Sequence, residues 1–141
     1  MMYSQDRQQM RQIFLVVREK QQAREPLSPM EAIIGQVIDQ HPEYHPLLDR
    51  KESLEQEFSG QNGQENPFLH MALHISLQEQ INVDRPPGIR GIYQTLASRL
   101  PDLHQAEHRM MECLAQTLWD AQDSGTPPSE EAYLNCLRRL L

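Results

Sequence analysis

Residues 66–83 have the sequence Asn-Pro-Phe-Leu-His-Met-Ala-Leu-His-Ile-Ser-Leu-Gln-Glu-Gln-Ile-Asn-Val. An asparagine followed by a proline is a typical helix start, because the asparagine side chain caps the first turn and proline suits the first helical position. At about 100° per residue, His70 and His74 fall on a narrow arc that also holds three aliphatic residues, Leu73, Leu77 and Ile81. The segment therefore predicts a helix from Pro67 to about Val83, with two histidines in the middle of its inward face.

Similar signals divide the rest of the chain into helices, and strand signals are almost absent. Ser28-Pro29-Met30-Glu31 combines an N-cap, a proline and the glutamate of a capping box, and Pro101 suits the first position of a long helix. Helices are predicted over residues 4–24, 29–41, 67–83, 89–100, 101–123 and 129–141. The polar residues 49–66 predict a mobile connection. We expect one all-α domain over residues 1–141, a helical bundle of about six helices.

The composition argues against several classes of function. The chain has 141 residues and a net charge of −7, and its basic residues form no cluster longer than a pair. An acidic chain without a basic stripe is a poor match to a phosphate backbone, so no nucleic-acid partner is expected. No apolar run approaches the roughly 18 residues that span a bilayer, and the first residues lack the layout of a secretory signal. We expect no membrane partner and a cytoplasmic protein whose two cysteines, Cys113 and Cys136, are reduced thiols.

All six histidines fall into three pairs with the same spacing, His41/His45, His70/His74 and His104/His108. On an α-helix this i, i+4 step places both imidazoles on one face, one turn apart, where they can bind a single ion. Histidine is also the commonest neutral metal ligand. The pattern predicts a metal site assembled from separate helices.

The third pair is predicted to face inward together with a carboxylate. His104 and His108 share an arc with Glu107, and Glu112 lies at the rim one turn later. Burying an imidazole without partners costs on the order of 1 to 3 kcal/mol, so several buried histidines in one small core need partners. A shared cation would supply them, and the carboxylates would complete the coordination or orient the rings.

The first pair is less regular than the other two. His41 falls on the apolar arc of the helix that starts at Pro29, but Pro42 and Pro46 flank His45, which is expected on a separate turn. Glu43 lies between the two histidines. The predicted ligands are His41, His45, His70, His74, His104, Glu107, His108 and Glu112.

Metal identity follows less directly from these residues. Imidazoles with a few carboxylates suit iron, zinc, manganese or nickel, or copper if Met71 or Met111 lies nearby, and six imidazoles exceed what one tetrahedral zinc ion needs. The predicted cofactor is a divalent transition metal, with iron favoured over zinc and manganese, in a dinuclear or open octahedral site.

Four segments together resemble a bacterial family known only as domain of unknown function 1841. They are His41-Pro-Glu-Tyr-His45, residues 66–74, residues 80–90 and residues 104–114. The resemblance covers nearly the whole chain and implies a bacterial, cytoplasmic origin, but it supplies no catalytic residue. A looser analogy links His70/His74 and His108/Glu112 to the HxxxH and HxxxE steps of hemerythrin-like bundles, although the order of motifs differs and no HxxxxD step follows.

Three functions are compatible with this pattern. The first is a non-haem metal centre between helices that handles oxygen, peroxide or redox chemistry. The second is a structural or interaction module, locked by a metal or a buried His/Glu network, that binds a protein partner or forms a homo-oligomer. The third is a metal-dependent hydrolase. Whether the protein is an enzyme is left open.

Overall fold

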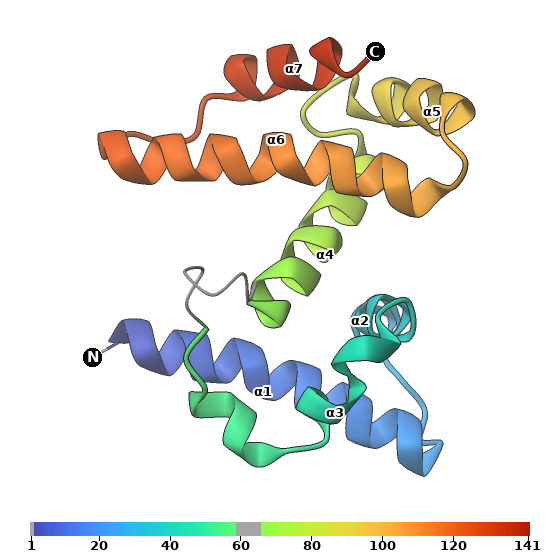
Figure 1. The fold of residues 1–141 in the computed structure, drawn as a ribbon, viewed down its shortest axis with the longest axis vertical. Helices are drawn as coiled ribbons and strands as arrows, with labels where there is room; N and C mark the ends of the chain where they lie inside the picture. The colour runs from blue at the N-terminus through green and yellow to red at the C-terminus, as the bar shows by residue number, and fades with distance from the viewer. Residues whose placement is uncertain (1, 59–65) are drawn as a thin grey trace. The chain divides into compact units, whose positions relative to one another are not determined.

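The computed structural model of the chain describes residues 2–58 and 66–141. These residues form seven α-helices and two short 3-10 helices, with no β-strand among them (Figure 1). The prediction of an all-α fold is confirmed. The chain divides into two compact units, residues 1–72 (unit 1) and residues 73–141 (unit 2). The prediction of a single domain stays a prediction.

Unit 1 begins with two helices joined by a short connection, α1 (Met2–Ala23) and α2 (Pro29–Asp39). Ser28 forms the predicted capping box at the start of α2, because its side chain accepts from the Glu31 amide while the Glu31 side chain accepts from the Ser28 amide. The unit also contains η1 (Pro42–Tyr44), α3 (His45–Leu48), η2 (Lys51–Glu55) and the first residues of α4 (Pro67–Val83). Its buried apolar residues include Phe14, Val17, Ile34, Val37, Ile38, Leu48 and Phe68.

The two prolines after α2 act as the sequence predicts. Helix α2 ends at Asp39, η1 begins at Pro42, and His45 starts the separate helix α3. His41 therefore lies just beyond α2, as the N-cap of η1, and the prediction that it belongs to the helix itself is wrong. Within the predicted connection 49–66, η2 is helical, and residues 59–65 lie outside the described residues.

A buried arginine of α1 binds the backbone of residues 53–56 in unit 1. Arg11 of α1 is 1% exposed, and its Nη1 donates to the carbonyls of Ser53, Leu54 and Gln56 at 3.2, 3.2 and 2.8 Å. The guanidinium carbon also lies 4.9 Å from the ring centroid of Phe68, within the range of a cation–π interaction. The arginine therefore provides the donors that the irregular backbone of this segment needs.

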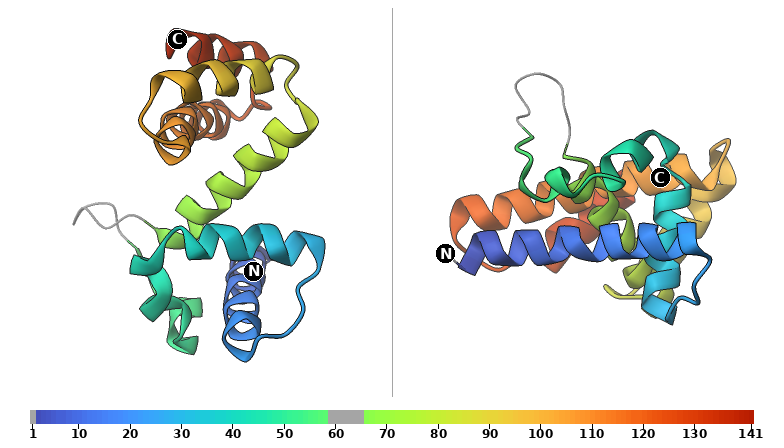
Figure 2. Two further views of the ribbon diagram at one scale, coloured as in Figure 1. Left: turned by 90° about the vertical axis from the view of Figure 1, so that its right-hand side faces the viewer. Right: turned by 90° about the horizontal axis from the view of Figure 1, so that it is seen from below.

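Unit 2 contains the remainder of α4 and three further helices, α5 (Ile89–Arg99), α6 (Leu103–Ser124) and α7 (Glu130–Arg139). In both figures α7 lies along α6 (Figures 1 and 2), and α5 contacts both of these helices. Their apolar faces meet in one core that includes Leu77, Ile89, Leu96, Ala106, Met110, Leu114, Tyr133 and Leu137. No helix in the described part of the chain is long and apolar enough to cross a membrane.

Helix α6 starts two residues later than the sequence predicts. The carboxylate of Asp102 accepts from the Gln105 amide at 2.7 Å, so Asp102 is the N-cap and Leu103 is the first helical residue. Pro101 lies before the cap, and its predicted place as the first residue of the helix is wrong. An aspartate both satisfies an exposed amide and places negative charge at the positive end of the helix, which favours this start.

The two cysteines form a disulfide, so the expectation of reduced thiols is wrong. Cys113 of α6 and Cys136 of α7 have their Cα atoms 5.7 Å apart, the usual separation for a disulfide. The packing of α7 on α6 brings these residues together, although they are 23 positions apart in the sequence.

Candidate metal centre

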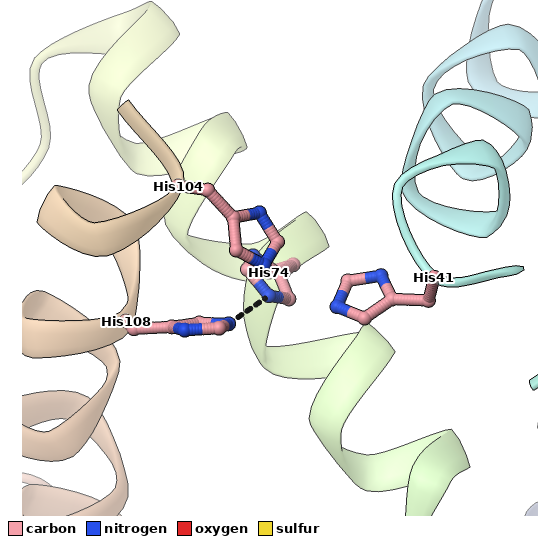
Figure 3. Close-up of side chains that lie close together, drawn as sticks. All are labelled: His41, His74, His104 and His108. Carbon is pink, nitrogen blue, oxygen red and sulfur yellow. Dashed lines mark hydrogen bonds between the residues drawn. The ribbon is translucent and has the colours of Figure 1, made fainter. Parts of the chain in front are cut away.

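Three histidines of unit 2 bring their ring nitrogens together. His74 comes from α4, and His104 and His108 come from successive turns of α6. One ring nitrogen of each lies within 4.8 Å of the other two (Figure 3, which also draws His41 of unit 1). This is the convergence of separate helices that the i, i+4 spacing predicts.

Glu107 fixes the orientation of His74. The imidazole of His74 is fully buried, and its Nδ1 donates to Oε2 of Glu107 at 2.9 Å. A carboxylate only accepts hydrogen bonds, so the Nδ1 of His74 carries a proton, and in the neutral ring Nε2 carries the lone pair. Glu107 is itself 8% exposed, so the pair is shielded from solvent. Metal-binding histidines are commonly held by a carboxylate in this way.

The Nε2 atoms of His74 and His108 face each other at 3.2 Å (Figure 3). Since the Nε2 of neutral His74 holds a lone pair, two arrangements are compatible with this distance. His108 can donate its Nε2 proton to His74, or both nitrogens can direct lone pairs at one cation.

His104 is the third histidine of the group, and its side chain is partly buried. The centroid of its ring lies 4.1 Å from the ring centroid of His108. Burial lowers the pKa of His104, and the neighbouring His108 and His74 lower it further, while Glu107 opposes the shift. A lowered pKa keeps this imidazole neutral near pH 7, the form that binds metal.

Sequence reasoning missed Tyr93 of α5 as a neighbour of the centre. Burial raises the pKa of the Tyr93 phenol, and the negative charge of Glu107 adds to that effect. The influence of Glu107 therefore reaches α5. Tyr93 lies within α5, and no feature of the sequence indicates that it would lie near a residue of α6.

Two histidines of unit 1, His41 and His45, are held by backbone carbonyls of α2. The Nδ1 of His41 donates to the Val37 carbonyl at 2.8 Å, and the Nε2 of His45 donates to the Ile38 carbonyl at 3.0 Å. Both carbonyls belong to the last turn of α2, so these imidazoles help to cap the helix, and the Ile38 carbonyl also accepts from the His41 amide at 3.0 Å.

His70, the second histidine of the α4 pair, belongs to unit 1. Its ring meets that of His41 edge to face, with centroids 5.1 Å apart, and lies near Tyr44, which stacks on His41.

The predicted carboxylates differ in their surroundings. The carboxylate of Glu107 accepts a hydrogen bond from His74. The side chain of Glu112, one turn after His108, is exposed. In unit 2 the structure therefore brings together four of the predicted residues, His74, His104, Glu107 and His108.

Comparison with known proteins adds a family but no activity. No curated protein and no solved structure matches this chain. The model of the family described as a domain of unknown function (DUF1841) matches residues 6–139, so the chain belongs to that family.

Proposed function

We propose that this protein binds a divalent transition-metal ion through His74, His104 and His108. The observation that supports this most directly is the approach of three imidazole nitrogens to within 4.8 Å, with His74 already oriented by a buried carboxylate. An imidazole held through its other nitrogen is prepared to bind a metal at little further cost in orientation.

The sequence suggests a more detailed version of this proposal, a dinuclear iron centre that handles oxygen or peroxide. That version needs more ligands than three imidazoles. The further ligands predicted from the sequence are His41, His45, His70, Glu107 and Glu112. Of these histidines, His41 and His45 each already have one ring nitrogen bonded to a backbone carbonyl, that of Val37 or Ile38.

A second candidate function is structural. The hydrogen bonds from His74 to Glu107 and between His108 and His74 form a continuous polar chain without any ion. Such a network would fix α4 against α6 and leave an outer surface of the protein to bind a partner.

Metal analysis of the untagged, full-length protein, purified without oxygen, separates these candidates. We expect at least about one transition-metal ion per chain, and a loss of most of it in His104→Ala. Gln105→Ala is the matched control, because Gln105 is the exposed neighbour on the same helix and should keep the metal.

An absorption spectrum before and after exposure to air or peroxide then tests for redox chemistry. About two irons per chain with an oxo-type charge-transfer band would support the oxygen-handling version. A protein that is purified without metal and binds no added zinc, iron or manganese would overturn the metal proposal. Destabilisation of that metal-free protein by His74→Ala would then support the structural network.

A further inference from the structure

We infer that this centre holds a single ion of the class that prefers imidazole, such as zinc, copper(II), nickel or cobalt, with Glu107 as a positioning residue outside the coordination sphere. This inference rests on the proposed metal site and specifies its stoichiometry, its ion class and the role of its carboxylate.

The donors in unit 2 are sufficient for one ion. Two-metal centres in helical bundles use several glutamates that project inward together with histidines. Here the converging ring nitrogens belong to His74, His104 and His108, while Glu107 is bonded to a ligand and Glu112 faces solvent. Three imidazoles are a known protein ligand set for a single zinc ion, with one position open to water or another donor.

The separation between the two facing nitrogens also suits one ion. Two nitrogens bound to the same tetrahedral zinc ion at about 2.0–2.1 Å lie about 3.3 Å apart. The Nε2 atoms of His74 and His108 are 3.2 Å apart. This pair needs almost no adjustment to share an ion, and a ring nitrogen of His104 lies within 4.8 Å of a ring nitrogen of each.

Neutral nitrogen donors select among metals. Manganese and magnesium prefer carboxylate, carbonyl and water oxygens, whereas imidazole favours the later divalent ions, whose affinities generally rise from manganese towards copper. A site whose inner donors are all imidazoles therefore favours zinc, nickel or copper(II) over manganese.

Glu107 contributes through His74. Its Oε2 accepts from the Nδ1 of His74 at 2.9 Å, which holds the ring, sets its tautomer and increases the basicity of Nε2. Loss of such a carboxylate typically weakens metal binding by about 10–100-fold. The amide oxygen of a glutamine can accept the same hydrogen bond without the charge, so Glu107→Gln should recover part of the affinity that Glu107→Ala loses.

Calorimetric titration of the metal-free full-length protein with zinc and then with manganese tests the inference. We expect about one zinc per chain, bound at least about 100-fold more tightly than manganese. Glu107→Ala should weaken zinc binding about 10–100-fold, with partial rescue by Glu107→Gln. Glu112→Gln, on the same helix but exposed, is the matched control and should leave the affinity within about twofold.

Cobalt(II) substitution gives a readout of the coordination sphere itself. Intense visible bands, typical of tetrahedral coordination, are expected and should keep their positions in Glu107→Gln. A change in these bands would make Glu107 a ligand and overturn its positioning role. Far-ultraviolet circular dichroism shows whether each variant is folded.

The two proposals fail in different ways. If no transition metal binds, both the proposed function and this inference are overturned. Two ions per chain, an oxo-type band with iron, or manganese bound as tightly as zinc would overturn this inference and leave the proposed function standing.

Discussion

The two units of this chain stabilise buried polar groups by different means. Unit 1 buries the permanent cation of Arg11, whose donors are directed at three backbone carbonyls beside an aromatic ring. Unit 2 buries an imidazole, His74, against the carboxylate of Glu107 and turns its second nitrogen towards another imidazole. The first arrangement places donors against the acceptors of its own backbone, and the second brings together nitrogens that can share an added ion.

The same contrast explains the fate of the HxxxH pairs. His41 and His45 follow a helix end, so each uses one ring nitrogen to cap a carbonyl of α2. His104 and His108 lie within the continuous helix α6 and project together. The pair His70/His74 lies on the continuous helix α4, but only His74 belongs to the converging histidines of unit 2, so an unbroken helix alone does not bring both members of a pair into the group.

The largest effect is expected from the buried arginine of unit 1. Arg11→Met keeps most of the side-chain volume but removes the arginine donor from three carbonyls, of which only that of Ser53 still accepts from a backbone amide of the described residues, so we expect a loss of about 4 kcal/mol in the stability of this unit. Hydrogen exchange of the α1 amides measures that loss. Arg18→Met is the control, because the ion pair of Arg18 with the exposed Asp49 should contribute less than about 1 kcal/mol. Equal losses in the two variants would contradict a special role for Arg11.

In unit 2, a disulfide links α6 to α7. Removing it with Cys113→Ala and Cys136→Ala should lower stability by about 3 kcal/mol, since the bond closes a loop between residues 23 positions apart. Chemical denaturation followed by circular dichroism measures the change, and a reductant should destabilise the wild type but not the double variant. Two thiols that react with an alkylating agent in the unfolded, unreduced protein would show that the bond does not form.

The next expected effect compares two histidines on one helix, His70 in unit 1 and His74 in unit 2. Because His74 is one of the three converging imidazoles, His74→Ala should lower zinc affinity by about 100-fold or more. His70→Ala should change it by less than about threefold. Calorimetric titration of each metal-free variant gives the comparison, and equal losses would return His70 to the ligand set predicted from the sequence.

Much of the helical framework could be predicted because its signals are local. Asn66 accepts from the amides of Phe68 and Leu69, so the cap predicted from an asparagine and a proline is present, and α4 ends at Val83 as expected. Helical projection also placed Glu107 on the inward arc with His104 and His108, and Glu107 is buried. These features depend on residues within a few turns of one another.

The features that could not be predicted depend on contacts between distant residues. Arg11 has acceptors 42 to 45 positions later, and a single sequence does not show which arginine turns inward. The disulfide requires the packing of α7 on α6, which spacing alone does not reveal. The role of Glu107 depends on the rotamer of His74 in α4, a detail that the shared arc on α6 does not contain.

The smallest expected effect compares the helix caps of the two units. Ser28→Ala in unit 1 and Asp102→Ala in unit 2 each remove a side chain that accepts from a first-turn amide, so each should cost about 1 kcal/mol. Asp102→Ala should cost slightly more, because it also removes a negative charge at the helix N-terminus, whereas Ser28→Ala leaves the Glu31 side chain bonded to the residue 28 amide. Thermal unfolding measures both losses, and added salt should reduce only the loss caused by Asp102→Ala.

Asp102→Asn separates the two contributions, since asparagine keeps the acceptor and removes the charge. If Asp102→Asn were as costly as Asp102→Ala, the charge rather than the hydrogen bond would determine where α6 begins.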